Sequence, residues 1–275
     1  MTKYRIVALD MDGTLLKSDK TVHPDTLRDI AEATQKGIHV VYCSGRAPVE
    51  MKDYIETLSD MRYAVSMSGA LVYDFKEKKK IYSCPVPKEM FKDIVEVAKV
   101  DDAMVHFLTE NESIVREDQI HHMVDFNMGV YQSMFLNIAR TVPDMMKEAE
   151  HYDSIPKINI YFHSKEARQA AYEKIKHLPL SFAFSEQTSL EMTAHGVTKA
   201  DGLSQLASSL HVTMDQIIGV GDGDNDRSFL KVVGLSVAMG NASEEIKAIC
   251  DEVTDDNDHN GTGKVIRKYC LENLE

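Results

Sequence analysis

Residues 5–14 read RIVALDMDGT, and this stretch decides how the rest of the chain is interpreted. It opens with an apolar run ending at Leu9, which is typical of a strand buried on both faces of a parallel sheet. Asp10 and Asp12 follow, and in extended backbone two residues at this spacing point the same way. Gly13 then favours a turn. The stretch predicts a buried strand that ends in two carboxylates.

Strand and helix patterns alternate on both sides of the long middle segment. In the N-terminal part, a helix is expected from Pro24 to Gly37, because Pro favours the first helical position and Gly favours the end. Short links between such elements indicate parallel strands joined by right-handed crossovers. The predicted strands of this α/β part are residues 5–9, 38–43, 63–67, 217–220 and 235–238, and the C-terminal helices begin at 199, 226 and 243.

The middle of the chain has a different pattern. Two of its strand candidates alternate polar and apolar residues, as strands of an antiparallel sheet with one open face do. We therefore predict an α/β fold with a Rossmann-like parallel-sheet core formed by residues 1–84 and 187–275. Residues 85–186 are expected to form an inserted α+β domain. The charged run at residues 76–80 is interpreted as a solvated hairpin turn.

The composition excludes several classes of protein. Apolar residues make up 43% of the 275 residues and charged residues 27%, which argues against intrinsic disorder. The formal net charge of −13 argues against nucleic acid as the main partner, because a phosphate backbone binds basic surfaces. A small phosphorylated molecule stays possible, since a bound metal or a local cation can overcome a net negative charge.

The same sequence predicts a cytoplasmic protein that does not span a membrane. No apolar run approaches the roughly 20 residues that a membrane-spanning helix needs. The first residues lead straight into a strand pattern, with no signal-peptide pattern expected there. The four cysteines are widely spaced and form no CxxC pair, so we expect free thiols in a reducing compartment. The sequence leaves the oligomeric state open.

Polar residues gather where the predicted parallel strands end. Asp10 follows the first strand, Ser44-Gly45-Arg46 follow the second, and residues 221–226 follow the strand at 217–220. Lys199 opens the preceding helix. Ligands of open parallel sheets bind beyond the carboxyl ends of the strands, so these clusters are expected to meet there.

The residue types in these clusters suit phosphoryl transfer. Many neighbouring carboxylates disfavour each other's ionisation, and a hard cation such as Mg²⁺ relieves this while also binding a substrate phosphate. Glycines let backbone N–H groups approach an anion closely. A carboxylate nucleophile, a second carboxylic acid, a metal and phosphate donors together describe transfer through an aspartyl-phosphate. The acidic residues are Asp10, Asp12, Asp222, Asp224 and Asp226, and the donors are Gly13, Thr14, Ser44, Gly45, Arg46 and Lys199.

In type and order these residues resemble the motifs of the haloacid dehalogenase superfamily of phosphatases. The long gap between Ser44 and Lys199 looks like the type with a C2 cap, and within it the Cof-like subfamily with a C2B cap. The resemblance covers the core and, more loosely, the inserted domain. The four motifs present are Asp10-x-Asp12-Gly13-Thr14, Ser44, Lys199 and Gly221-Asp222-x-x-Asn225-Asp226.

The resemblance implies a role for each position. Asp10 is the expected nucleophile and Asp12 the expected general acid and base. Mg²⁺ is expected at Asp10, the backbone carbonyl of Asp12 and Asp222, with Asp226 as a further ligand or a support. Ser44 and Lys199 are expected to hold phosphoryl oxygens. The remaining expected phosphate and substrate contacts are Gly13, Thr14, Gly45, Arg46 and Asn225.

The expected activity is Mg²⁺-dependent hydrolysis of a small organic phosphate monoester, a sugar phosphate or a similar metabolite. Two alternatives stay open. A phosphomutase of the phosphomannomutase type uses the same motifs, and only the acceptor of the phosphoryl group separates the two. A phospho-acceptor or binding module without turnover also carries acidic residues and a lysine, although a second carboxylate at Asp12 argues for turnover. Asp224 is interpreted as a solvated loop residue rather than a metal ligand.

Overall fold

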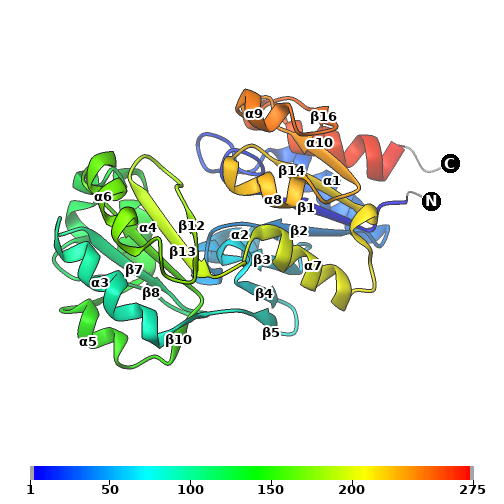
Figure 1. Cartoon of the computed structure of the whole chain (residues 1–275). Coiled ribbons are helices and arrows are strands. Elements are labelled where there is room, and N and C mark those ends of the chain that lie inside the picture. Colours follow the sequence, from blue (N-terminus) through cyan, green and yellow to red (C-terminus); the bar gives the residue numbers. More distant parts are fainter. Residues whose placement is uncertain (1–2, 273–275) are drawn as a thin grey trace. The chain divides into compact units, whose positions relative to one another are not determined.

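The computed structural model describes residues 3–272 and divides into two units. Unit 1 comprises residues 1–45, 53–82 and 198–275, and unit 2 comprises residues 46–52 and 83–197. Unit 1 is therefore built from both ends of the chain, with unit 2 inserted between them (Figure 1). The predicted α/β class is confirmed.

Unit 1 is an open sheet with helices. In the described residues the strand order is β16-β15-β14-β1-β2-β3-β4-β5, with β16 to β3 parallel and β4 antiparallel to β3. The strands are β1 (Ile6–Leu9), β2 (His39–Cys43), β3 (Tyr63–Ser66), β4 (Leu71–Asp74), β5 (Lys79–Ser83), β14 (Ile217–Gly221), β15 (Leu235–Ala238) and β16 (Glu252–Val253).

Helices pack on this sheet through the alternate residues of its buried strands. Ile6 and Ala8 of β1 face a core that also contains side chains of α7, α8 and α9, whereas α1 packs against β2 and α10. The helices are α1 (Pro24–Gln35), α2 (Lys52–Thr57), α7 (Lys199–Ser209), α8 (Arg227–Leu230), α9 (Glu244–Lys247) and α10 (Gly261–Ile266), which continues as a π-helical turn over Arg267–Glu272.

Unit 2 contains a second sheet, which is mainly antiparallel. Its order is β12-β13-β11-β7-β8-β9 among the residues described, and only the β8–β9 pair in that series is parallel. A short pairing of β6 (Val86–Pro87) with β10 (Ser154–Ile155) lies beside it. The strands of the sheet are β7 (Met104–Leu108), β8 (Ser113–Arg116), β9 (Ala139–Val142), β11 (Lys157–Tyr161), β12 (Leu180–Ala183) and β13 (Ser189–Ala194).

One face of this second sheet packs on helices and the other is partly covered by an irregular segment. Ile158 and Ile160 of β11 join a core with α3 (Phe91–Lys99), α5 (Met145–Ala149) and α6 (Lys165–Ile175). On the opposite face, Tyr161 packs with residues 120–138, which form short 3₁₀ turns and α4 (Gln132–Ile138).

The expected boundary between residues 186 and 187 differs from the structure. β13 lies after that boundary, yet it pairs with β11 and β12, so unit 2 extends to Val197. Its sequence, SLEMTA, alternates polar and apolar residues, which is the pattern of the other half-open strands of unit 2.

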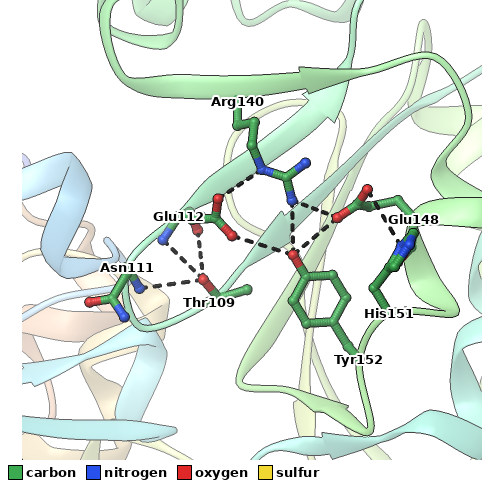
Figure 2. Close-up of polar contacts among 7 residues, drawn as sticks. All are labelled: Thr109, Asn111, Glu112, Arg140, Glu148, His151 and Tyr152. Atoms are coloured by element: carbon green, nitrogen blue, oxygen red, sulfur yellow. Dashed lines mark hydrogen bonds and ion pairs between the residues drawn. The ribbon is translucent and has the colours of Figure 1, made fainter.

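Arg140 links the edge strand β9 by hydrogen bonds to Glu112, Glu148 and Tyr152 (Figure 2). Its Nε donates to Glu112 Oε1 at 2.7 Å, next to the β7–β8 turn, and its Nη2 donates to Glu148 Oε1 of α5 at 2.5 Å. Tyr152 Oη accepts from the same Nη2 at 2.9 Å and donates to Glu148 Oε1 at 3.0 Å. One guanidinium thus ties a strand, a turn and a helix together.

Candidate active site

Three neighbouring strands of unit 1 deliver the central residues of the site. β1 lies between β2 and β14, and all three run parallel. Asp10, Ser44 and Asp222 each follow directly on the carboxyl end of one of these strands. Because these carboxyl ends share one edge of the sheet, the three residues come from distant parts of the sequence to the same place.

Lys199 lies between two carboxylates. Its side chain is fully buried, and its Nζ donates to Asp10 Oδ1 and to Asp226 Oδ1, both at 2.6 Å. Burial opposes the charged form, but the two carboxylates outweigh it and raise the pKa of Lys199 above its usual value. The ammonium is therefore a fixed positive charge in the centre of the site.

The backbone around α7 explains how Lys199 reaches this position. Lys199 is the first residue of the helix, and the N-cap Thr198 accepts a hydrogen bond from the Asp201 amide. A Cβ atom at Gly202 would lie 2.7 Å from Val65 Cγ1, so glycine is required for α7 to approach β3 this closely. The start of the helix is thereby held against the end of the sheet.

Asp226 has both carboxylate oxygens engaged. Oδ1 accepts from Lys199, and Oδ2 accepts from the backbone N–H groups of Asp222 and Gly223, each at 3.0 Å. These bonds close the loop after β14 and fix the Asp222 backbone. Asp226 therefore links that loop to Lys199 through hydrogen bonds on both of its carboxylate oxygens.

Asp222 packs against the loop that follows β1. Its Oδ1 accepts from Thr14 Oγ1 at 2.8 Å. Gly13 has a φ of +82°, and a Cβ there would lie 2.4 Å from Asp222 Oδ2, so no other residue fits without displacing this carboxylate. The DxDGT glycine is explained by this approach.

The cluster is rich in negative charge and fits a metal ion. One carboxylate oxygen from each of Asp10, Asp222 and Asp226 lies within 4.8 Å of the others. Burial, helped by Asp226 and Asp222, raises the pKa of Asp10 well above its usual range, and burial raises the pKa of Asp222 to about 6 despite the Thr14 hydrogen bond. A hard divalent cation binds such closely spaced carboxylates and offsets the repulsion between them. All three carboxylates already accept hydrogen bonds, and Asp226 accepts the most of them, from Lys199 and two backbone N–H groups.

The carboxylate of Asp12 is not one of the three that lie close together. Its Oδ1 accepts a hydrogen bond from Lys20 Nζ at 2.8 Å, and the two side chains are 32% and 38% exposed. The sequence interpretation missed Lys20. A lysine in a polar turn carries no signal of its own, because most lysines lie in such exposed positions.

The other predicted phosphate contacts differ in how exposed they are. Ser44 is buried, and its backbone is held on both sides by hydrogen bonds with Val65 and Ser68. Gly45 follows directly on Ser44. Asn225 is exposed at the start of the loop helix. The roles predicted for these residues stay predictions.

Two charged neighbours of the motifs have contacts outside the carboxylate cluster. Arg46 is grouped with unit 2, where its Nη1 contacts the Glu50 carbonyl oxygen at 3.4 Å and Met134 Sδ at 3.7 Å. Asp224 has a side chain that is 82% exposed and pairs with Arg227 at 2.8 Å. This pairing agrees with the interpretation of Asp224 as a solvated loop residue.

Known proteins resemble the chain over almost its whole length. The sequence profile of the haloacid dehalogenase-like hydrolases matches residues 7–266. The Bacillus subtilis 5-amino-6-(5-phospho-D-ribitylamino)uracil phosphatase YitU is 27% identical, with 98% of each chain covered. The Escherichia coli pyridoxal phosphate phosphatase YbhA is 24% identical, over 97% of this chain and 99% of its own.

A solved structure shows the same fold. The crystal structure of a haloacid dehalogenase-like hydrolase from Bacteroides thetaiotaomicron superposes with a TM-score of 0.84 at 24% identity, covering 96% of this chain and 99% of that chain. Both units of the present chain are thus represented in one known architecture. Among the described residues, none of the helices has the length and apolar character needed to cross a membrane.

Proposed function

Because the chain belongs to the haloacid dehalogenase-like hydrolase family, we propose that it hydrolyses small organic phosphate monoesters through an aspartyl-phosphate formed on Asp10. That it is an enzyme, a phosphatase of the Cof-like type, follows from the family and its phosphatase relatives. The hypothesis of a binding module without turnover is set aside on the same ground. The metal identity, the substrate class and the residue roles are our proposal, and a cytoplasmic location stays a prediction from the sequence.

The observation that carries the proposal is the ammonium of Lys199 between Asp10 and Asp226. Lys199 fixes Asp10 Oδ1, so the orientation of the nucleophilic carboxylate is set before substrate binds. When an Asp10 oxygen attacks phosphorus, negative charge builds on the phosphoryl oxygens, and the buried ammonium offsets it. Ser44, Thr14, Asn225 and the backbone amides at Gly13 and Gly45 are proposed to bind these oxygens.

Asp12 is proposed to move the protons in both steps. In the first step the bond between phosphorus and the leaving oxygen breaks, and Asp12 gives that oxygen a proton. In the second step Asp12 takes a proton from water as the water oxygen attacks phosphorus. The bond between phosphorus and Asp10 then breaks, which releases inorganic phosphate and restores the carboxylate.

A divalent cation, which we propose is Mg²⁺, would be held by Asp10, the Asp12 backbone carbonyl and Asp222. When bound it supplies positive charge that brings the phosphate dianion and the Asp10 carboxylate together. The carboxylate oxygens within 4.8 Å and the raised pKa of Asp222, at about 6, support such a site.

A hydroxyl-rich phosphate ester, such as a sugar or polyol phosphate, is the proposed substrate class. The ribityl phosphate named for the relative YitU is a compound of this class.

The test is phosphate release from 4-nitrophenyl phosphate and from a panel of sugar, polyol and pyridoxal phosphates, with and without Mg²⁺. We expect turnover that requires the metal and falls at least about 10³-fold in Asp10→Asn, because the nucleophile is lost. Asp224→Asn, in the same acidic loop, is the matched control and should keep wild-type activity.

Two results would contradict the proposal. If Asp10→Asn turned over substrate as fast as the wild type, the aspartyl-phosphate route would be excluded. Phosphoryl transfer to a second hydroxyl of the sugar, with no inorganic phosphate released, would favour the phosphomutase alternative. The order of kcat/KM values across the panel tests the substrate class separately, since a preference for pyridoxal phosphate over every polyol phosphate would contradict it.

A further inference from the structure

A tight hairpin lies between the DxDGT loop and α1. The Lys17 amide donates to the Thr21 carbonyl at 2.8 Å, and the Lys20 amide donates to the Lys17 carbonyl at 2.9 Å. Lys20 has a φ of 64°, in the left-handed region, as the closing position of such a turn requires. The turn therefore dictates the direction in which the Lys20 side chain leaves the backbone.

Distant parts of unit 1 hold this hairpin in place. Tyr54 Oη of α2 donates to the Lys20 carbonyl oxygen at 3.0 Å. Ser18 donates to Asp258 through its amide at 2.9 Å and through its hydroxyl at 2.6 Å. Asn257 Nδ2 donates to the Leu16 carbonyl at 2.9 Å. None of these bonds uses the Lys20 side chain, so its removal leaves the hairpin anchored.

The anchored hairpin presents the Lys20 ammonium to Asp12, at 2.8 Å from Oδ1. Lys17, on the same hairpin, pairs instead with Asp19 at 2.9 Å. We propose that Lys20 is a positioning residue for the reaction: it holds the Asp12 side chain in the orientation from which the protonated acid gives its proton to the leaving oxygen and the carboxylate later takes one from water. This inference rests on the proposed function, which gives Asp12 that proton transfer.

The physical reason for such a residue is geometric. Asp12 is partly exposed, and an ion pair with a residue on an anchored hairpin restricts the rotamers that its side chain takes up. An ion pair exposed to this extent adds little to stability. Its larger effect is on orientation, because proton transfer requires hydrogen-bond distance to the reacting oxygen. Loss of Lys20 should therefore damage catalysis much more than folding.

The experiment compares Lys20→Met, Lys20→Arg and the matched control Lys17→Met on two kinds of ester. An alkyl phosphate has a poor leaving group that must be protonated, whereas 4-nitrophenyl phosphate releases a stable phenolate that needs little protonation. Because general acid catalysis contributes about 10²–10⁴-fold, kcat/KM of Lys20→Met should fall by about 10–100-fold on the alkyl ester and less than about 3-fold on the aryl ester.

The other variants should separate positioning from a structural effect. Lys20→Arg, which keeps the positive charge and its donors, should recover the alkyl ester rate to within about fivefold, and Lys17→Met should stay within about twofold on both esters. In an Asp12→Asn background, Lys20→Met should cause no further loss, because the group it orients is gone.

Each contrary result points to a different error. Equal losses on both esters, or a loss in Lys17→Met as large as in Lys20→Met, would overturn the inference and leave the proposed function intact. Unchanged alkyl phosphate turnover in Asp12→Asn would overturn the proposed role of Asp12, and the role of Lys20 with it.

Discussion

Asp10, Lys199 and Asp222 could be found from the sequence because each stands at a strand end or a helix start. Strand ends are readable as the points where an apolar run stops, and parallel pairing then brings them to one edge of the sheet. Lys20 could not be found in this way. Its contact with Asp12 depends on a hairpin closed by Tyr54, Ser18 and their partners, and such anchoring leaves no periodic pattern.

His106 is a second residue whose state only the structure reveals. It is fully buried in β7, where Nδ1 lies 3.0 Å from Tyr161 Oη and Nε2 lies 2.7 Å from Ser113 Oγ. Burial, reinforced by the positive charge of Lys157, lowers its pKa from 6.5 to about 3. The ring therefore stays neutral in the folded protein at any pH near neutrality.

This predicts a loss of stability in mild acid. Below pH 6.5 the unfolded chain binds a proton at His106 and the folded chain does not, so the free energy of unfolding falls as the pH falls toward about 3. Between pH 7.5 and pH 5 the loss through His106 is about 2 kcal/mol. Urea unfolding at both pH values measures it, and His106→Gln, which does not titrate, should be less sensitive to pH by that amount. Equal sensitivity in both proteins would contradict the prediction.

Among the elements, the regular ones were predicted well and the irregular ones were not. β15 spans Leu235–Ala238 and α1 begins at Pro24, as the sequence indicated. Residues 120–138 carried no readable period because short 3₁₀ turns, with left-handed Asn127 between them, interrupt the helical spacing of their buried side chains. The pairing of β13 with β11 was missed because the core was expected to resume just before it.

The edge strand β9 should depend on Arg140. Replacing it with Met removes the contacts to Glu112, Glu148 and Tyr152 and leaves Glu148, which is 11% exposed, with one partner fewer. We expect the free energy of unfolding to fall by about 1–2 kcal/mol. Urea unfolding followed by tyrosine fluorescence measures this change.

Arg116 of β8 is the matched control for Arg140. It also pairs with two carboxylates, but those of Asp102 and Asp118 are 71% and 68% exposed. Arg116→Met should therefore cost less than about 1 kcal/mol, as exposed ion pairs do. If the two variants lose the same amount, the buried side of the Arg140 network is not what stabilises β9.

At the scale of the whole molecule, the α/β class and the insertion followed from the order of elements along the chain. Strand–helix alternation at both ends and an antiparallel pattern between them left few topologies that obey the crossover rule. The boundaries of the insertion did not follow, because residues 46–52 group with unit 2 although they lie between two elements of unit 1. The order of elements along the chain does not indicate that these residues belong with unit 2.

Metal binding should stabilise the whole protein. A cation that binds only the folded state, at a free concentration of about 100 times its Kd, adds about 2.7 kcal/mol to the free energy of unfolding. We therefore expect Mg²⁺ to raise Tm, and a chelator to reverse the change. In Asp222→Asn, which removes a proposed ligand, the increase should be absent or much smaller.

The control for this measurement is Asp224→Asn, two residues further along the same loop. Its carboxylate is 82% exposed and pairs with Arg227, so the increase in Tm should match that of the wild type. A loss of the increase in both variants would indicate general screening of the acidic loop by the metal. An increase retained in Asp222→Asn would exclude Asp222 as a ligand.

The position of β1 between β2 and β14 also has a consequence for biosynthesis. On the ribosome β1, β2 and β3 emerge early, but β14 begins about 200 residues after β1, which at 5–20 residues per second is roughly 10–40 s. Throughout that interval β1 has an apolar, unpaired edge where β14 will later bind. Unit 2, whose residues 83–197 are continuous, can fold in the meantime. Nascent chains are thus most exposed to aggregation or chaperone capture before the strand carrying Asp222 has been made.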